Sequence, residues 1–264
     1  MPCMKYILLL ITSFYFDCTQ AQYTTDPLQA NDSTHLTVHG NKSSGTPITT
    51  KSLIVPSLCL AYGFVALHNH NLIDLNHSTK AELREDHPHF LTHVDNYLQF
   101  SPGLAVFGLN ALGIKGKNNF RDRSIIYGLT TLLSTAIVFP IKNITKVQRP
   151  DKSGFNSFPS GHTTMAFASA EFLRQEYKDV SPWYGIAGYT VAAATGALRM
   201  YNNKHWLSDV VAGAGLGILS TRLVYAVYPS IKRKLFKDKP VNSIVMPYYQ
   251  QHGGGLAYVH YFGN

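Results

Sequence analysis

Three stretches of this chain bring together side chains of the kind that bind or transfer phosphoryl groups. The first reads Lys-Asn-Ile-Thr-Lys-Val-Gln-Arg-Pro and runs from Lys142 to Pro150. Arg149 follows Lys142 by seven residues, so both cations are expected on one face of a helix that Pro150 ends. Arginine binds two anionic oxygens in a fork, and lysine adds a point charge. Alone, the pattern is weak, because basic residues that end an apolar helix are more commonly membrane-interface or solvated positions.

The second stretch is Phe-Pro-Ser-Gly-His, which ends at His162 and is followed by Thr163. Ser160 has the side chain of a helix cap, and Gly161 allows backbone N–H groups to approach an anion at the positive end of a helix. His162 would then lie in the first turn, facing that anion. A Ser-Gly turn that happens to precede a histidine is the alternative.

The third stretch begins at Arg199 and contains His205 and Asp209. Because Asp209 follows His205 by four residues, a helix would let its carboxylate accept one imidazole N–H and leave the other ring nitrogen unprotonated. A neutral imidazole held in this way is a nucleophile or a base. The alternative is a structural Asp-His pair that caps a helix.

The three stretches in this order, Lys-x6-Arg-Pro, Pro-Ser-Gly-His and Arg-x5-His-x3-Asp, closely resemble the motifs of the type 2 phosphatidic acid phosphatase (PAP2) superfamily. This superfamily includes bacterial non-specific acid phosphatases and vanadium haloperoxidases. The resemblance extends over about residues 97–229. Two departures are visible: Leu198 occupies the place of a serine that usually begins the third motif, and only residues 151–158 separate the first two motifs, which implies a tight rim on the site.

The resemblance implies a catalytic role for three of these residues. His205 would attack phosphorus and form a phosphohistidine, Asp209 would orient it, and His162 would protonate the leaving oxygen and then activate water. Phosphate binding is assigned to Lys142, Arg149, Ser160, Gly161 and Arg199. No metal or cofactor is implied, and vanadate is expected to inhibit as a mimic of five-coordinate phosphorus.

Six apolar segments with helix-favouring composition predict an all-α fold, a bundle of about six core helices in residues 51–235. They cover residues 53–67, 102–114, 124–141, 163–177, 183–198 and 207–228. Residues 124–141 carry no charge, and residues 207–228 carry only Asp209 and Arg222. These two segments are therefore the best candidates to span a membrane.

The two ends of the chain differ from this helical middle. Residues 1–21 resemble an export signal that would be cleaved after Ala21, with an uncleaved leader as the alternative. Residues 22–50 are rich in Ser and Thr and predict a flexible lead-in. At the other end, residues 243–249 and 256–262 are β-rich runs around consecutive glycines, which predicts a hairpin within residues 240–264.

The composition leaves the class of the bundle open. Of 264 residues, 45% are hydrophobic and only 14% charged, with a mean hydropathy of −0.05; a soluble apolar bundle and a membrane bundle both fit. The net charge of +8 points to an anionic partner, and the three motifs make phosphate the expected anion rather than nucleic acid. If the bundle crosses a membrane, the basic residues 115–123 and 232–239 should be cytoplasmic, with one crossing before Lys115.

Histidines also cluster between the first two apolar segments, at positions 68, 70, 77, 87, 89 and 93. The spacing His87-x-His89-x3-His93 could be drawn as a metal site. Carboxylate or cysteine partners at a known metal-binding spacing are lacking, so a solvated or interfacial connection is the better interpretation. Tyr201 and Trp206, beside the third motif, are expected to pack rather than to bind substrate, with a place at the entrance of the site as the alternative.

These observations predict an exported, metal-independent phosphatase that acts on a lipid phosphate or diphosphate and is membrane-associated, with its site on the periplasmic side. A soluble periplasmic non-specific acid phosphatase, a vanadate-dependent haloperoxidase and a non-enzymatic phosphate-binding protein are the alternatives. Lipid A phosphates, polyprenyl diphosphate, phosphatidic acid and phosphatidylglycerol phosphate all present the same terminal group, so the motifs are compatible with each of them.

Overall fold

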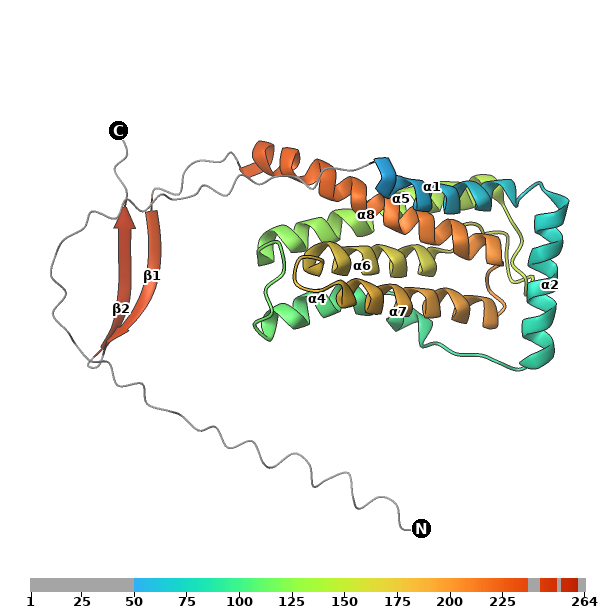
Figure 1. Ribbon diagram of the computed structural model, residues 1–264, viewed down its shortest axis with the longest axis horizontal. Coiled ribbons are helices and arrows are strands. Elements are labelled where there is room, and N and C mark those ends of the chain that lie inside the picture. The colour runs from blue at the N-terminus through green and yellow to red at the C-terminus, as the bar shows by residue number, and fades with distance from the viewer. Residues whose placement is uncertain (1–49, 237–242, 251–252, 261–264) are drawn as a thin grey trace, which may run out of the picture. The chain divides into compact units, whose positions relative to one another are not determined.

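The computed structural model describes residues 50–236, 243–250 and 253–260, and the first of these ranges is a bundle of helices (Figure 1). In chain order the helices are α1 (Thr50–Val65), α2 (His70–Asp86), α3 (Asp95–Leu98), α4 (Ser101–Ala111), α5 (Phe120–Thr145), α6 (Gly161–Tyr177), α7 (Pro182–Tyr201) and α8 (Leu207–Phe236). Strands β1 (Ser243–Gln250) and β2 (Gly253–His260) pair antiparallel, with Ser243 opposite His260. The helical bundle predicted from the sequence is thus confirmed.

Helix α6 forms the centre of the bundle, and most of its residues are buried. Its small side chains, such as Ala166 and Ala170, let neighbouring helices approach closely. On α8, a Cβ at Gly217 would lie 2.2 Å from the carbonyl oxygen of Thr164, so only glycine fits there. This close packing fixes how the first turns of α6 and α8 lie relative to each other.

Helices α5 to α8, taken in chain order, alternate in direction, so motifs far apart in the sequence meet at one end of the bundle (Figure 1). We call this the site end: α5 and α7 finish there, carrying Lys142 and Arg199, while α6 and α8 begin there, carrying His162 and Asp209. We call the other end, where α4 and α6 finish and α5 begins, the basic end. Lysines and arginines gather at the basic end, namely Lys115, Lys117, Arg121, Lys178, Lys232, Arg233 and Lys234.

Two helices that the sequence analysis did not predict, α2 and α3, cover the site end. Helix α2 turns by 94° from the direction of α1 and is capped by Asn69, whose side chain accepts a hydrogen bond from the Leu72 N–H. Asn76, buried on α2, both donates to and accepts from Ser208 at distances of 3.0 Å. These contacts attach α2 to the first turn of α8.

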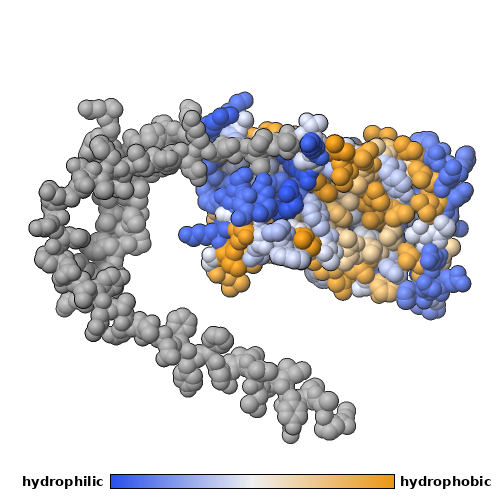
Figure 2. Space-filling model, viewed as in Figure 1, coloured by the Kyte–Doolittle hydropathy of each residue, from blue (hydrophilic) through white to orange (hydrophobic). Residues whose placement is uncertain are grey.

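Several helices carry apolar side chains on their outer surface. On α5, Leu132, Phe139 and Ile144 are 65%, 65% and 79% exposed, and only 22% of the most apolar stretch of this helix is buried. Figure 2 shows hydrophobic residues over the middle of the bundle and hydrophilic residues towards its two ends. By length and composition α5 and α8 could each cross a membrane, and the bent pair α1 and α2 passes the same test as one unit.

The remaining expectations about the chain ends fall mostly outside the described residues. The export signal lies there entirely, and so does the lead-in except for Thr50, which begins α1. The two residues that would join β1 to β2 lie there as well, so the hairpin stays a prediction, as do the domain boundaries. Most of residues 68–93, interpreted from the sequence as a solvated or interfacial connection, form the helix α2, on which Asn76 is the one buried residue.

Candidate active site

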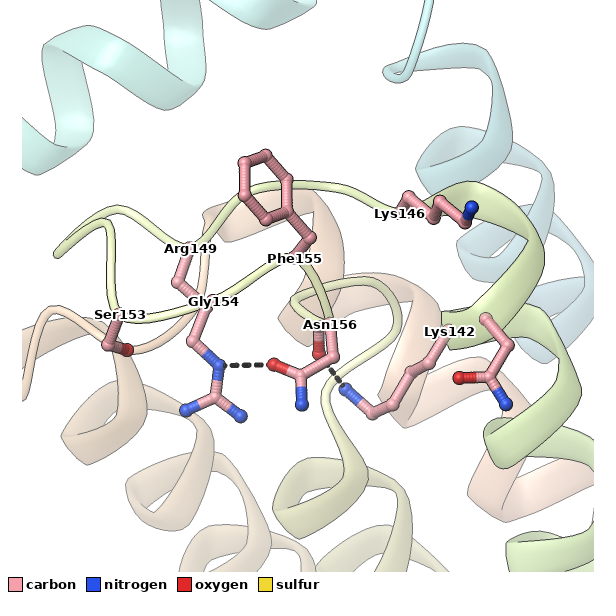
Figure 3. A pocket seen from close by; sticks show the side chains of 8 residues that line it. Lys142, Lys146, Arg149, Ser153, Gly154, Phe155 and Asn156 are labelled. Carbon is pink, nitrogen blue, oxygen red and sulfur yellow. Dashed lines mark hydrogen bonds between the residues drawn. The ribbon is translucent and has the colours of Figure 1, made fainter.

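The first motif does not lie on a single helix. Lys146 adopts a left-handed backbone conformation (φ 47°) that ends α5 after Thr145, so Arg149 lies in the following loop and the expectation of one helical face was wrong. The loop nevertheless brings the two cations together around one residue. Lys142 donates to the carbonyl oxygens of Asn156, at 2.5 Å, and Ser157, at 3.0 Å, while Arg149 Nε donates to Asn156 Oδ1 at 2.8 Å (Figure 3).

A cleft of about 480 Å³ opens beside this loop. Its lining includes Lys142, Lys146 and Arg149, so positive charge dominates it, and Figure 3 shows the side chain of Arg149 on the same side of the loop as that of Lys142. The tight rim that the short connection implied is held by hydrogen bonds within the loop, for example from the Arg149 N–H to the Gly154 carbonyl at 2.8 Å. The cations of the first motif therefore border a positively charged cleft.

The second motif forms the cap of α6. Ser160 Oγ accepts hydrogen bonds from the Thr163 N–H, at 3.4 Å, and from the Thr163 hydroxyl, at 2.9 Å, while the Ser160 N–H donates to the carbonyl oxygen of Asp209 at 3.0 Å. The capping role expected for Ser160 is confirmed. Its backbone also ties the start of α6 to the start of α8, so the second and third motifs are held together directly.

His162, in the first turn of α6, is oriented by a neighbour that no motif contains. Its Nε2 lies 2.8 Å from the side-chain oxygen of Asn96 on α3. Burial, followed by the positive charge of Arg199, lowers the pKa of His162 to about 4. The imidazole is therefore neutral at pH 7 in the free protein, and an anion bound among the cations would raise this pKa again.

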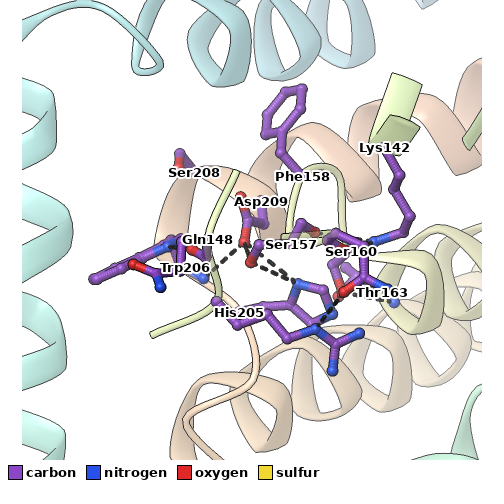
Figure 4. Close-up of polar contacts among 12 residues, drawn as sticks. Lys142, Gln148, Ser157, Phe158, Ser160, Thr163, His205, Trp206, Ser208 and Asp209 are labelled. Atoms are coloured by element: carbon purple, nitrogen blue, oxygen red, sulfur yellow. Dashed lines mark hydrogen bonds and ion pairs between the residues drawn. The ribbon is translucent and has the colours of Figure 1, made fainter. Parts of the chain in front are cut away.

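The third motif carries the most buried part of the site. His205 is 3% exposed and Asp209 is fully buried. Asp209 Oδ2 lies 3.3 Å from His205 Nδ1 and also accepts hydrogen bonds from the Ser157 hydroxyl, at 2.5 Å, and the Trp206 N–H, at 2.9 Å (Figure 4). A carboxylate in this position takes the Nδ1–H of the neutral imidazole, which leaves Nε2 with a free lone pair.

Burial lowers the pKa of His205 to about 4, although the hydrogen bond to Asp209 opposes this shift. The ring is consequently neutral over most of the pH range. A neutral, oriented imidazole next to several cations is the arrangement that nucleophilic attack on a phosphoryl group requires. Asp209 therefore acts on the tautomer and direction of the ring without making it cationic.

Arg199, at the end of α7, is held from one side only. Its Nη1 donates to Asp95 Oδ2 on α3 at 2.6 Å, and the arginine side chain is 10% exposed. Its Nε is buried and has no hydrogen-bond partner within the described part of the chain. A buried donor without a partner is unfavourable, so this N–H is available to an anionic ligand.

The structure thus gathers all eight predicted site residues at the site end, although it gives Ser160 and Lys142 hydrogen bonds that the sequence did not suggest. Three neighbours were missed: Ser157, which donates to Asp209, and Asp95 and Asn96 on α3. Only Ser157 gave a signal, since it lies next to the second motif. Among the described residues, no group of three or more metal-ligating side chains is found. One histidine of the cluster between the first two apolar segments, His77, packs against Trp206 with ring centroids 4.9 Å apart.

Comparison with known proteins supports the motif analysis. Residues 123–233 match the family model of the PAP2 superfamily, which confirms the resemblance inferred from the three motifs. The chain is 40% identical over 148 residues, 54% of its own length and 33% of the relative's, to a lipid A 1-phosphatase of Porphyromonas gingivalis. It is 37% identical over 76 residues, 29% of its length and 36% of the relative's, to the bacitracin transport permease protein BcrC of Bacillus licheniformis. The chain thus spans about a third of the length of these curated relatives.

Two solved structures are also similar. One is a transmembrane PAP2 type phosphatidylglycerolphosphate phosphatase from Bacillus subtilis, with a TM-score of 0.46 and 19% identity over 70% of this chain and 99% of the other. The other is Aquifex aeolicus LpxE, with a TM-score of 0.42 and 23% identity over 55% of this chain and 92% of the other.

Proposed function

We propose that this chain, whose residues 123–233 match the PAP2 superfamily, is a phosphatase that removes the terminal phosphate of a lipid phosphate or diphosphate through a phosphohistidine. The observation that carries the proposal is the buried His205, whose Nδ1 is engaged by Asp209 and whose ring is influenced by the positive charges of Lys142 and Arg199. The residues of the site supply a nucleophile, an acid and positive charge for this reaction.

In the first step, His205 Nε2 attacks phosphorus and the bond from phosphorus to the leaving oxygen breaks. Protonated His162 gives its proton to that oxygen, which departs as an alcohol or as a phosphate monoester. In the second step, His162 takes a proton from water, and the resulting hydroxide attacks the phosphohistidine. The P–N bond breaks, inorganic phosphate forms, and His205 and His162 return to their starting protonation states.

Charge on the equatorial phosphoryl oxygens requires donors that are in place before the reaction. The unpartnered Nε of Arg199 is one such donor. Lys142 and Arg149 are close by, and both presently donate to Asn156, an uncharged residue. An incoming phosphoryl group is a stronger acceptor than a neutral amide or carbonyl, so both side chains can turn to it without breaking an ion pair.

A lipid substrate is favoured by the position of the site. It lies where α5 ends and α8 begins, and these are the two helices that could cross a membrane, so a lipid headgroup would reach it while the tail remained in the bilayer. The lipid A 1-phosphatase among the relatives supports the same substrate class. The lysines and arginines of the basic end favour a cytoplasmic location for that end and therefore a periplasmic location for the site.

The test is phosphate release by the purified full chain in detergent micelles, measured with the four candidate lipids and with a water-soluble phosphomonoester. We expect release from at least one lipid in the presence of a chelator, inhibition by vanadate, and loss of release in His205→Ala. Equal activity of His205→Ala and the unaltered chain would contradict the mechanism. Faster turnover of the soluble ester than of any lipid would instead support a non-specific acid phosphatase. The low pKa of His162 fits this alternative as well, because it favours activity at acidic pH.

A further inference from the structure

We infer that the short helix α3 positions two parts of this active site at once, the proton donor through Asn96 and an anion-binding arginine through Asp95. The inference rests on the proposed function. Both are positioning residues, since Asn96 acts through His162 and Asp95 acts through Arg199. Consecutive residues in a helix point in different directions, which allows Asn96 to reach α6 while Asp95 reaches α7.

Asn96 determines which nitrogen of His162 carries a fixed proton. The side-chain oxygen of Asn96 can only accept, so the Nε2 atom 2.8 Å away must donate its N–H. In the neutral ring this leaves Nδ1 as the basic nitrogen, and in the protonated ring it leaves the Nδ1–H as the proton to be given away. Asn96 therefore keeps Nε2 protonated in both states and directs the proton exchange to Nδ1.

Asp95 holds the guanidinium of Arg199 in one orientation. The carboxylate is 1% exposed, and its Oδ2 accepts from Arg199 Nη1 at 2.6 Å and from Asn202 Nδ2 at 3.4 Å. The contact with Asp95 occupies Nη1 of Arg199 and leaves Nε of the same side chain without a partner among the described residues. A buried arginine fixed at one end loses less conformational entropy when it binds an anion.

The segment that leads into α3 is itself attached to the end of α7. The Thr92 N–H donates to Asn202 Oδ1 at 2.9 Å, and Asn202 Nδ2 donates back to the Thr92 carbonyl at 2.9 Å. This reciprocal pair places α3 relative to the helix that carries Arg199. The positions of Asp95 and Asn96 are consequently set by the third motif and not by α3 alone, which as a single turn would be unstable in isolation.

The charges around His162 make the role of Asn96 measurable. Arg199 on α7, Arg149 in the loop and Lys142 on α5 lower the pKa of His162, and Asp95 on α3 opposes them. Asn96 is neutral, so Asn96→Asp adds a carboxylate at hydrogen-bonding distance from Nε2. A new negative charge so close stabilises the imidazolium and should move the alkaline limb of the pH profile upward by about 1 to 3 pH units.

The experiment compares Asn96→Ala, Asn96→Asp and a control, Tyr97→Ala, in the purified full chain with the lipid that the unaltered chain hydrolyses best. Tyr97 lies on the same helix and is 78% exposed. Asn96 is exposed as well, so its substitution should leave the thermal unfolding midpoint unchanged. We expect kcat of Asn96→Ala to fall by about 10², the alkaline limb of Asn96→Asp to move upward, and Tyr97→Ala to match the unaltered chain.

Asp95 is tested with vanadate, which probes the anion site without turnover. We expect Asp95→Asn to raise the vanadate inhibition constant about tenfold, and Asp95→Glu, which restores the charge, to recover part of the loss. Because Asp95 is buried, each unfolding midpoint is measured alongside. An unchanged vanadate constant in a folded Asp95→Asn variant would overturn the role of Asp95.

The outcomes separate this inference from the proposed function. If the unaltered chain hydrolyses the lipid and His205→Ala does not, but both Asn96 variants keep its kcat and its pH profile, the role of Asn96 is overturned while the proposed function stands. A lower KM in Asn96→Ala with an unchanged pH profile would also overturn it, since Asn96 would then merely occupy the place of the substrate. Absence of phosphatase activity in the unaltered chain would overturn both.

Discussion

The two ends of the bundle use charged side chains in opposite ways. Towards the basic end, buried carboxylates are fully engaged: Glu171 accepts hydrogen bonds from Arg174, Gln175, Tyr189 and Arg222. Asp122 is similarly engaged by Tyr228, at 2.9 Å, and by Lys232, at 2.7 Å. Each of these two carboxylates is thus matched by donors within the fold.

At the site end, Lys204 is paired with Asp151, but the three cations expected to bind phosphate are less completely matched. Lys142 and Arg149 donate to neutral carbonyl and amide oxygens, and Arg199 has one carboxylate partner and a buried N–H without any among the described residues. Asp209, the other buried carboxylate here, is used by a histidine, a serine and a backbone N–H.

This difference indicates which charges belong to the fold and which to the ligand. Arg199 is buried and Lys142 and Arg149 are half-buried, and incompletely matched charge in such surroundings is unfavourable, so the proposed binding of an anion would account for the surplus of positive charge at the site end. The matched charges towards the basic end connect α6 with α7 and α8 and need no ligand. Substitutions at the two ends should therefore have different consequences for turnover.

The largest effect on turnover is expected for the nucleophile. His205→Ala removes the atom that bonds to phosphorus, so kcat should fall by about 10⁴ or more. Phosphate release under saturating substrate measures it, and thermal unfolding of the variant checks that it folds. A decrease of less than about tenfold would show that the buried histidine serves the fold, as the matched charges do.

The second-largest effect on turnover is expected for Arg199, and it is tested with a matched pair of arginine substitutions. Arg199→Ala removes a donor to the transition state and should lower kcat by about 10² to 10³. Arg222→Ala, which removes a partner of Glu171, should change kcat per folded molecule by less than about threefold. The same phosphate-release assay applies to both, and equal losses of kcat would remove the distinction between the two ends.

The pH profile gives a smaller, graded effect. The acid must be protonated, and the pKa of His162 is about 4 in the free protein, so kcat/KM should fall about tenfold for each pH unit above that value. Below about pH 4 His205 becomes protonated, and activity should fall there as well. A profile of kcat/KM that still rises from pH 5 to pH 8 would contradict the assignment of His162 as the acid.

The smallest effect on turnover is expected for Glu171→Gln. This change leaves Arg174 and Arg222 without a carboxylate and should lower the free energy of unfolding by about 3 kcal/mol, while kcat of the folded variant stays within about twofold of the original. Lys234→Gln, an exposed position at the basic end, is the control. Denaturation in detergent measures the free energy of unfolding. A large loss of kcat without a loss of stability would place Glu171 in the catalytic machinery.

The sequence predicted the long helices because their apolar segments are strong local signals, but it missed α2 and α3. Helix α2 is polar, and its position depends on contacts such as that between Asn76 and Ser208, which are 132 residues apart. The end of α5 was predicted too late in the chain. Pro150 is a clear helix stop signal in the sequence, whereas a lysine such as Lys146 gives no sequence signal that it adopts the left-handed conformation that ends the helix.

The candidate site was predictable where motifs carry it and hidden where contacts across the chain do. The four-residue spacing of His205 and Asp209 was visible in the sequence, although His205 itself precedes the helix α8 on which Asp209 lies. Asp95 and Asn96 were not, since they meet their partners across 104 and 66 residues. Residues of this kind become visible only when the fold places α3 against α6 and α7.

The central claim is that His205 becomes phosphorylated during turnover, and direct detection of that intermediate tests it. The full chain would be mixed with a lipid phosphate substrate and quenched in alkali within one turnover, because phosphohistidine survives alkali better than acid, and its peptides would be analysed by mass spectrometry. The account predicts a phosphoryl group on His205 that disappears as phosphate is released and is absent from His205→Ala. Full turnover with no phosphoryl group on His205, or with one on His162 instead, would contradict it.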